Sequence, residues 1–154
     1  MAFPVAPSAL LPIALFTAVC AFAMWKGDEE ERLTGLALAF AAIAAPFLKD
    51  HRWLGLQWGV LAVDAAFFLL ILVIAFRTTK FWPLAAAGFQ LLGLVTHAVI
   101  TMEAGVRAWA YVTAGVIWSY LILIALAVGT WNAWRARQPA ASGAPTIPPG
   151  ATRR

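Results

Sequence analysis

The chain contains five long apolar segments joined by short polar connections, and this pattern most constrains its fold. Hydrophobic residues make up 63% of the 154 positions and charged residues only 12%, against roughly 25% charged residues in soluble domains. Mean hydropathy is +0.83. The sequence therefore predicts an all-α integral membrane helical bundle with five transmembrane helices. The predicted spans are residues 9–25, 33–48, 54–76, 81–102 and 108–131.

The first two segments are the shortest. A transmembrane helix needs about 20 apolar residues, and residues 33–48 reach only about 24 Å as a helix. We expect this second segment to span the bilayer as a short helix, with a re-entrant or interfacial helix as the alternative. The n-region "MAFPVAPS" lacks a positive charge, so we expect the first segment to be retained rather than cleaved as a signal peptide.

Basic residues predict the orientation. The first and third loops and the start of the tail carry six Lys or Arg residues, whereas the other side carries three. The positive-inside rule then places the amino terminus outside and the carboxyl terminus in the cytoplasm. Residues 1–137 form the predicted bundle. Residues 138–154 are rich in Pro, Ala, Ser and Gly, which predicts a disordered tail.

Tryptophans support the predicted boundaries, because indole rings prefer the headgroup region. Seven of the eight lie near a segment end. These are Trp25, Trp53, Trp58, Trp82, Trp109, Trp131 and Trp134, whereas Trp118 lies deep in the fifth segment.

Four polar residues interrupt the third and fourth segments. Gln57 and Asp64 are seven residues apart, as are Gln90 and His97, so each pair shares one helix face. In antiparallel neighbours joined by a short loop, one register sets Gln57 level with His97 and Asp64 level with Gln90. We therefore expect an intramembrane polar cluster of these four residues. A competing register, with Asp64 opposite His97, is harder to reach but stays open.

The cluster has two interpretations. An ionised group at mid-bilayer costs about 2.5–3.5 kcal/mol, so Asp64 must be protonated, partnered or in contact with water. The cluster either ties helices together or uses Asp64 as a proton site. His97 offers a third possibility, an axial ligand for a tetrapyrrole beside Gly93, although a hydrogen-bonded core histidine is the simpler interpretation. Cys20 is the only cysteine, so we expect no metal site.

Two other features concern packing. The first loop, residues 26–32, holds four acidic residues, and we interpret it as a solvated connector, with docking to a basic partner as the alternative. Gly115 and Ser119 form a small-x-x-x-small pattern that favours close helix packing, within the bundle or against a partner.

The runs "KFWPLAAAGFQLLGLVTHAV" and "WSYLILIALAVGTW" give the chain a resemblance to a known group. It resembles small uncharacterised multi-spanning inner-membrane proteins of alphaproteobacteria. The resemblance covers the last two segments best, implies a bacterial inner-membrane location, and implies no activity.

The sequence contains no histidine cluster, paired carboxylates or Gly-rich phosphate loop, so we expect a non-catalytic protein. We predict an accessory or scaffold subunit of an inner-membrane complex. The alternative is an oligomeric transporter or proton-conducting protein with Asp64 as the titrating group. Expected partners are the lipid bilayer and other membrane subunits or further copies of the chain, with no nucleic acid and no cofactor other than the alternative tetrapyrrole at His97.

Overall fold

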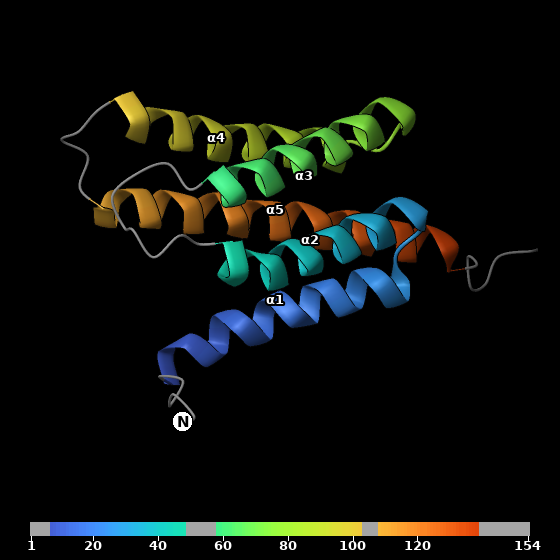
Figure 1. Ribbon diagram of the computed structural model, residues 1–154. Coiled ribbons are helices and arrows are strands. Elements are labelled where there is room, and N and C mark those ends of the chain that lie inside the picture. The colour runs from blue at the N-terminus through green and yellow to red at the C-terminus, as the bar shows by residue number, and fades with distance from the viewer. Residues whose placement is uncertain (1–6, 49–57, 103–107, 139–154) are drawn as a thin grey trace, which may run out of the picture.

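The computed structural model describes residues 7–48, 58–102 and 108–138, which form five α-helices and no strand. The predicted all-α fold is therefore confirmed for this part of the chain. The helices, drawn in Figure 1, are α1 (Pro7–Lys26), α2 (Glu29–Leu48), α3 (Trp58–Arg77), α4 (Trp82–Met102) and α5 (Ala108–Arg137). Three of them, α3, α4 and α5, are long and apolar enough to cross a membrane.

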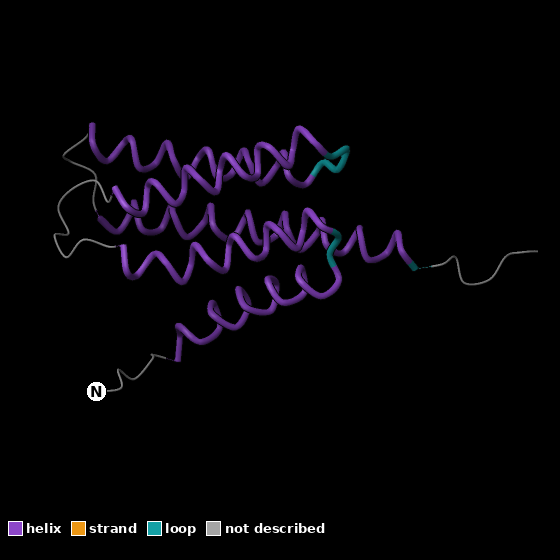
Figure 2. Tube along the Cα trace, turned by 45° about the vertical axis from the view of Figure 1, so that its right-hand side comes forward, coloured by secondary structure: helices purple, strands orange, loops and turns teal. Residues whose placement is uncertain are grey.

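The helices form an up-and-down bundle around α5. Helix α5 contacts α1, α2 and α4, whereas α3 contacts α2 and α4. The α1–α2 and α3–α4 connections lie at the same end of the bundle, and α5 projects past the other helices there (Figures 1 and 2). Helix α1 leans away from the bundle toward its amino-terminal end, and its side chains at Leu10, Leu11 and Ile13 are exposed.

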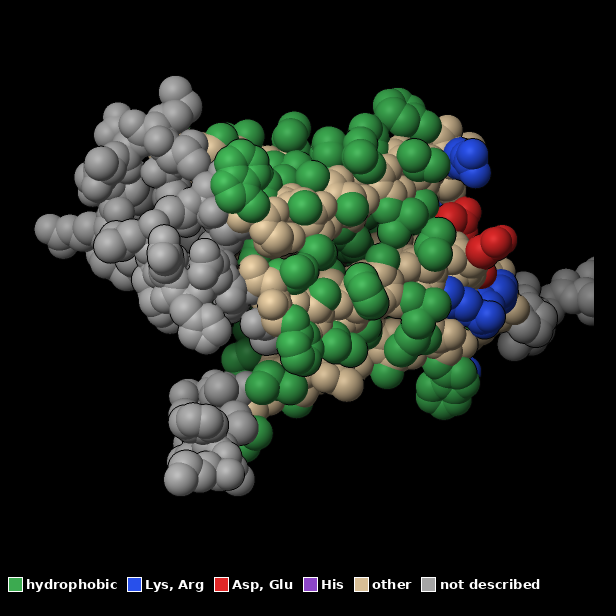
Figure 3. All heavy atoms as spheres, viewed as in Figure 1, with side chains coloured by type: hydrophobic (Ala, Val, Ile, Leu, Met, Phe, Trp, Pro, Cys, Tyr) green, Lys and Arg blue, Asp and Glu red, His purple; other side chains and the backbone are tan. Residues whose placement is uncertain are grey.

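A narrow apolar core joins the helices. Nine buried residues form it: Ala23, Phe67, Ile71, Trp82, Ala86, Ala87, Ile122, Ala125 and Leu126. Many larger apolar side chains lie on the outside instead, including Phe40, Phe76 and Ile124, and Figure 3 shows them covering the flank of the bundle. An apolar exterior around a core rich in alanine is the arrangement expected where lipid replaces water.

Local sequence explains where α2 begins. Asp28 occupies the cap position, and its backbone N–H donates to Glu31 Oε2 at 2.9 Å. This is the reciprocal half of a capping box, in which the third helical residue satisfies the backbone of the cap residue. Three glutamates in the first turn also stabilise the helix, because their negative charges lie at the positive end of the helix dipole. Gly27 is required before the cap, because an added Cβ would lie 2.3 Å from Ala23 O.

Helix α5 has 30 residues and is longer than predicted. Its length of about 45 Å exceeds the hydrocarbon thickness of about 30 Å. The predicted fifth span ends at residue 131, where the apolar segment ends, and the helix continues through polar residues to Arg137, the end of the predicted bundle. Gln57 and the predicted tail after residue 138 lie outside the described residues.

Candidate functional site

Asp64, Gln90 and His97 form a polar cluster between α3 and α4. Gln90 Nε2 donates to the backbone oxygen of Asp64 at 3.1 Å and lies 3.4 Å from Oδ1. On the other carboxylate oxygen, His97 Nε2 lies 3.0 Å from Oδ2. Gln90 and His97 are buried, while 32% of the Asp64 side chain is exposed. Asp64 thus connects two positions of α4 that are seven residues apart.

The observed register combines the two that the sequence allowed. The expected pairing of Asp64 with Gln90 is present, and so is the competing contact between Asp64 and His97. Sequence reasoning favoured Gln90 as the partner of Asp64, because the register that pairs Asp64 with His97 leaves the larger axial offset, about 6 Å against about 4.5 Å. Both residues reach Asp64 because they approach different atoms of it. Gln90 donates to the backbone oxygen of Asp64, whereas His97 lies beside the carboxylate oxygen Oδ2.

A second polar contact joins α4 to α5 beside the cluster. The indole N–H of Trp118 donates to Thr96 Oγ1 at 3.2 Å, and Thr96 donates to the backbone oxygen of Leu92. Trp118 was the tryptophan that did not fit an interfacial position, and its N–H has a partner inside the bundle instead. This pair could not be predicted from the sequence, because a threonine that bonds to its own helix is ordinary in any apolar helix.

The geometry at His97 does not favour a tetrapyrrole. Nε2, the atom that points away from the backbone and ligates most readily, lies against Asp64. Only 11% of the side chain is exposed. Gly93 leaves space, since an added Cβ would meet nothing within 4 Å, but that space does not reach an exposed ring nitrogen. We therefore assign His97 to the polar cluster.

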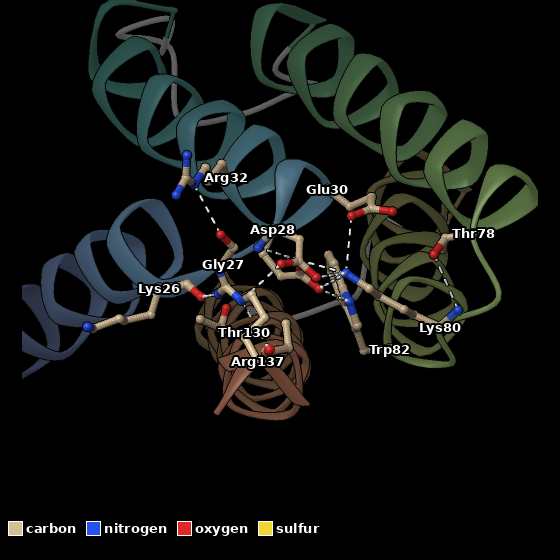
Figure 4. A network of polar contacts seen from close by, with 12 residues as sticks. Lys26, Gly27, Asp28, Glu30, Arg32, Thr78, Lys80, Trp82, Thr130 and Arg137 are labelled. Carbon is tan, nitrogen blue, oxygen red and sulfur yellow. Dashed lines mark hydrogen bonds and ion pairs between the residues drawn. The ribbon is translucent and has the colours of Figure 1, made fainter. Parts of the chain in front are cut away.

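The densest polar network lies at the end of the bundle that carries the α1–α2 and α3–α4 connections. We call it the charged end, comprising residues 26–32, 77–82 and 135–137. Lys80 Nζ donates to three carboxylates, at 2.8 Å to Asp28 Oδ2, 3.1 Å to Glu30 Oε2 and 3.0 Å to Glu31 Oε1. Figure 4 shows the ammonium group among these oxygens. One lysine thereby joins the α3–α4 connection to the start of α2.

Glu31 is the most unusual member, because its side chain is 0% exposed. Trp82 donates its indole N–H to Glu31 Oε1 at 2.8 Å, so the carboxylate bonds to Trp82, Lys80 and the backbone of Asp28. A solvated connector is therefore the wrong interpretation for this residue. The predicted interfacial position of Trp82 is also wrong, since its ring is buried and lies against Gly129, where an added Cβ would be 2.4 Å away.

Arg137 brings the end of α5 into the same network. Its Nε lies 3.3 Å from Asp28 Oδ1, and its terminal nitrogen donates to the backbone oxygen of Lys26. Arg32 Nε donates to the backbone oxygen of Gly27 at 3.1 Å. All five helices consequently have a residue in or next to one polar network, which sequence reasoning missed because charges distant in the chain carry no local signal.

Charge explains the protonation states here. The hydrogen bond from Lys80 holds the pKa of Asp28 below its ordinary value of 3.8. The backbone N–H of Glu30, followed by Lys80, lowers the pKa of Glu30 below 4.5. Burial alone would lower the pKa of Lys80, but hydrogen bonds to Asp28, Glu31 and Glu30 outweigh it and raise that pKa above 10.5. These directions all favour the charged forms of Asp28, Glu30 and Lys80.

The three carboxylates could in principle hold a metal ion, because one oxygen from each lies within 4.8 Å of the others. The cation already among them is the Lys80 ammonium. With its three N–H donors satisfied, this group offsets part of the negative charge and occupies the position that the three carboxylates share. We assign the cluster to an internal ion-pair network.

An apolar layer separates the polar cluster from the charged end. Arg77, at the end of α3, follows Asp64 by thirteen positions, a distance of about 20 Å. The buried residues of the core in this interval are aliphatic, aromatic or alanine. Among the described residues, no titratable side chain in that core connects the two groups.

Comparison of the chain with protein-family models, with curated proteins and with solved structures found no match.

Proposed function

We propose that the chain is a small non-catalytic integral membrane protein, an accessory or scaffold subunit of a bacterial inner-membrane complex. The observation that carries this proposal is that three buried polar side chains, Glu31, Gln90 and His97, contact polar groups of other elements. Asp64, Gln90 and His97 join α3 to α4, and Glu31 and Lys80 join the two connections of the charged end. Polar side chains that bond to one another between helices stabilise a bundle, and none of them is left as an activated nucleophile.

The proposal also includes the topology: all five helices span the bilayer, and the charged end faces the cytoplasm. Six basic residues lie at the charged end: Lys26, Arg32, Arg77, Lys80, Arg135 and Arg137. The positive-inside rule favours the cytoplasmic side for such an end. Helices α1 and α2 each have 20 residues, and the three remaining helices are longer or more apolar, so all five are proposed to span together.

An outward-facing stripe on α5 supports association with a partner. Ser119 is exposed and donates to the backbone oxygen of Gly115, and a Cβ built on Gly115 would meet no described atom within 4 Å. The small-x-x-x-small pattern therefore does not serve a close contact among the described residues. A partner helix could approach the backbone there, as small residues permit in membranes.

Extraction of a tagged chain from its native membrane in mild detergent tests this proposal. Size exclusion with mass determination and in-line visible absorbance should show a colourless chain that comigrates with other subunits. Replacement of Gly115 by Leu should reduce comigration, whereas Gly88→Leu, equally open in the bundle, should not. A colourless homo-oligomer, seen again after extraction in a gentler amphiphile, would reject the subunit proposal.

A proton-conducting oligomer is the second candidate, and the partial exposure of the Asp64 side chain favours it. The apolar layer below Asp64 excludes a proton path through the core that the structure describes, so conduction would require a path between copies. In proteoliposomes, Asp64→Asn should abolish a pH-gradient-driven flux while the folded yield stays unchanged. Equal flux from the variant and the unaltered chain would reject this candidate.

A further inference from the structure

A groove runs between α4 and α5 beside the charged end. Its volume is about 580 Å³, within the range of about 300–1,000 Å³ that small-molecule sites occupy. Small residues on α5 leave it open, namely Ala125, Gly129 and Ala133. Larger apolar side chains form its walls, with Phe89 on α4 and Ile124 on α5.

The length of the groove matches one leaflet of a bilayer. On α5 its lining residues extend from Leu121 to Ala136, which is about 22 Å of helix. Half of a bilayer, headgroups included, measures about 20–22 Å. Trp131 and Trp134 lie near the polar end, in edge-to-face contact with ring centroids 4.9 Å apart, at the depth where indole rings mark the headgroup region.

The polar end of the groove has a specific composition. Asp28, Lys80 and Asn132 are the polar residues that line it. Lys80 already donates to three carboxylates, so it has no donor left for a ligand. Asp28 already pairs with Lys80 through Oδ2 and with Arg137 through Oδ1, but its side chain is partly exposed and each carboxylate oxygen has a second lone pair for a further donor. Asn132 is exposed, and its amide forms no hydrogen bond with another residue that the structure describes.

We propose that this groove binds one ethanolamine phospholipid from the leaflet at the charged end. The headgroup ammonium donates to Asp28, the phosphate accepts from the amide of Asn132, and an acyl chain lies along Phe89 and Ile124. The inference requires only that the bundle lies in a membrane. It does not depend on the accessory role.

Charge selects this headgroup over the other common ones. A primary ammonium carries three N–H donors for a carboxylate, whereas choline has none. The three carboxylates of Asp28, Glu30 and Glu31 outnumber the two cations that contact them, Lys80 and Arg137, so a glycerol headgroup, which leaves the lipid with a net negative charge, is less favourable here. A partner helix would cover the apolar walls but would supply nothing for the polar end.

Native mass spectrometry of the purified full chain tests the proposal. The detergent-solubilised protein is titrated with phosphatidylethanolamine, phosphatidylcholine or phosphatidylglycerol at equal concentrations. We expect one retained molecule of phosphatidylethanolamine, bound about tenfold more tightly than phosphatidylglycerol, as one charge-assisted hydrogen bond allows. Equal affinity for the three lipids would overturn the proposal, because it would indicate ordinary surrounding lipid.

A groove-filling variant locates the site. Ala85 is half-buried and lines the groove, so Ala85→Leu should lower the affinity for phosphatidylethanolamine about tenfold. The matched control is Ala62→Leu, at an exposed alanine of α3 outside the groove, which should leave that affinity unchanged. Unchanged binding by Ala85→Leu, or an equal loss in both variants, would overturn the assignment.

Photocrosslinking of the unaltered chain avoids any effect of substitution on folding. Phosphatidylethanolamine with a photoreactive acyl chain should label residues 81–89 and 121–136 in preference to α1 and α3. Uniform labelling of every helix would overturn the proposal. Protection of those residues by another protein in native membranes would also overturn it, because a protein would then occupy the groove.

Discussion

Trp82 donates its indole N–H to a carboxylate oxygen of Glu31 across 2.8 Å, and both side chains are buried although each lies next to a connection between helices. Such positions normally place a tryptophan in the headgroup region and a glutamate in water. Here the two side chains bond to each other inside the charged end, and Lys80 supplies the positive charge opposite Glu31. An anion without solvent exposure is tolerated only where charge and hydrogen bonds are supplied together.

Lys80→Met should destabilise the bundle more than any other single change at a basic residue of the charged end. The substitution leaves the buried Glu31 side chain with only Trp82 and a backbone N–H as partners. Removing one partner of a buried ion pair costs about 3–5 kcal/mol. Unfolding by titration with a denaturing detergent in mixed micelles, followed by circular dichroism, would measure the loss.

Arg77→Met is the matched control, because Arg77 is an exposed basic residue at the end of α3. Surface substitutions of this kind change stability by about 0.5 kcal/mol or less. If the two variants lost the same stability, Lys80 would contribute only as a surface charge and its role as the counter-ion of Glu31 would be rejected.

Gly129→Ala should also destabilise the bundle, because the added Cβ would lie 2.4 Å from the Trp82 ring. Overpacking of this kind costs about 1–3 kcal/mol, and displacement of the ring would lengthen the bond to Glu31. Tryptophan fluorescence would report a more polar environment for the indole, and unfolding in mixed micelles would report the lost stability.

Gly88→Ala provides the comparison for this prediction. A Cβ at Gly88 meets no described atom within 4 Å, and alanine is favoured over glycine in a helix interior by about 1 kcal/mol. The two substitutions are chemically identical, yet they should shift stability in opposite directions. A gain in stability from Gly129→Ala would show that Trp82 can move at no cost.

The charged end should make stability depend on pH in the acid range. The folded-state pKa values of Asp28 and Glu30 are lowered from 3.8 and 4.5, so the folded chain binds protons less readily than the unfolded chain. Their contribution is present above those ordinary values and is lost as the pH falls through the lowered ones. Unfolding midpoints measured between neutral pH and pH 3 should therefore decrease, most steeply below about pH 4.5.

An Asp28→Asn, Glu30→Gln double variant should show a smaller decrease over the same range, because neither position then titrates. Lys80 gives no acid-range effect of its own. Its pKa is raised above 10.5, so its contribution is complete below that value and is lost only as the pH rises through the raised one. An unchanged pH profile in the double variant would assign the acid sensitivity to other groups.

The sequence pattern predicts the helices and part of the polar cluster, but it does not predict the charged end. Apolar segment length predicts the helices well, because hydrocarbon contact imposes one requirement along a whole segment. Spacing of seven residues, with an antiparallel neighbour, also predicts that Asp64 lies level with Gln90. Neither argument could predict that Glu31 is buried, since that depends on Lys80 and Trp82, about fifty positions away. An acidic run next to a glycine is typical of an exposed loop, and only tertiary packing distinguishes the two cases.

Asp64 and His97 should show measurable coupling in a double-mutant cycle. The variants Asp64→Asn and His97→Gln retain polar groups of similar size, and the contact between Asp64 Oδ2 and His97 Nε2 is 3.0 Å. Interhelical polar contacts in membranes average about 0.6 kcal/mol and reach about 1.7 kcal/mol. We expect coupling toward the upper value, because only 11% of the His97 side chain and 32% of the Asp64 side chain are exposed, and unfolding of the four proteins in mixed micelles would measure it. A parallel cycle between Asp64→Asn and Thr96→Val provides the reference, since Thr96 bonds to Trp118 and Leu92 instead and should couple weakly to Asp64. Coupling near zero for the Asp64 and His97 pair would mean that the carboxylate depends on Gln90 alone, and the bundle would then have one polar tie between α3 and α4 at this level instead of two.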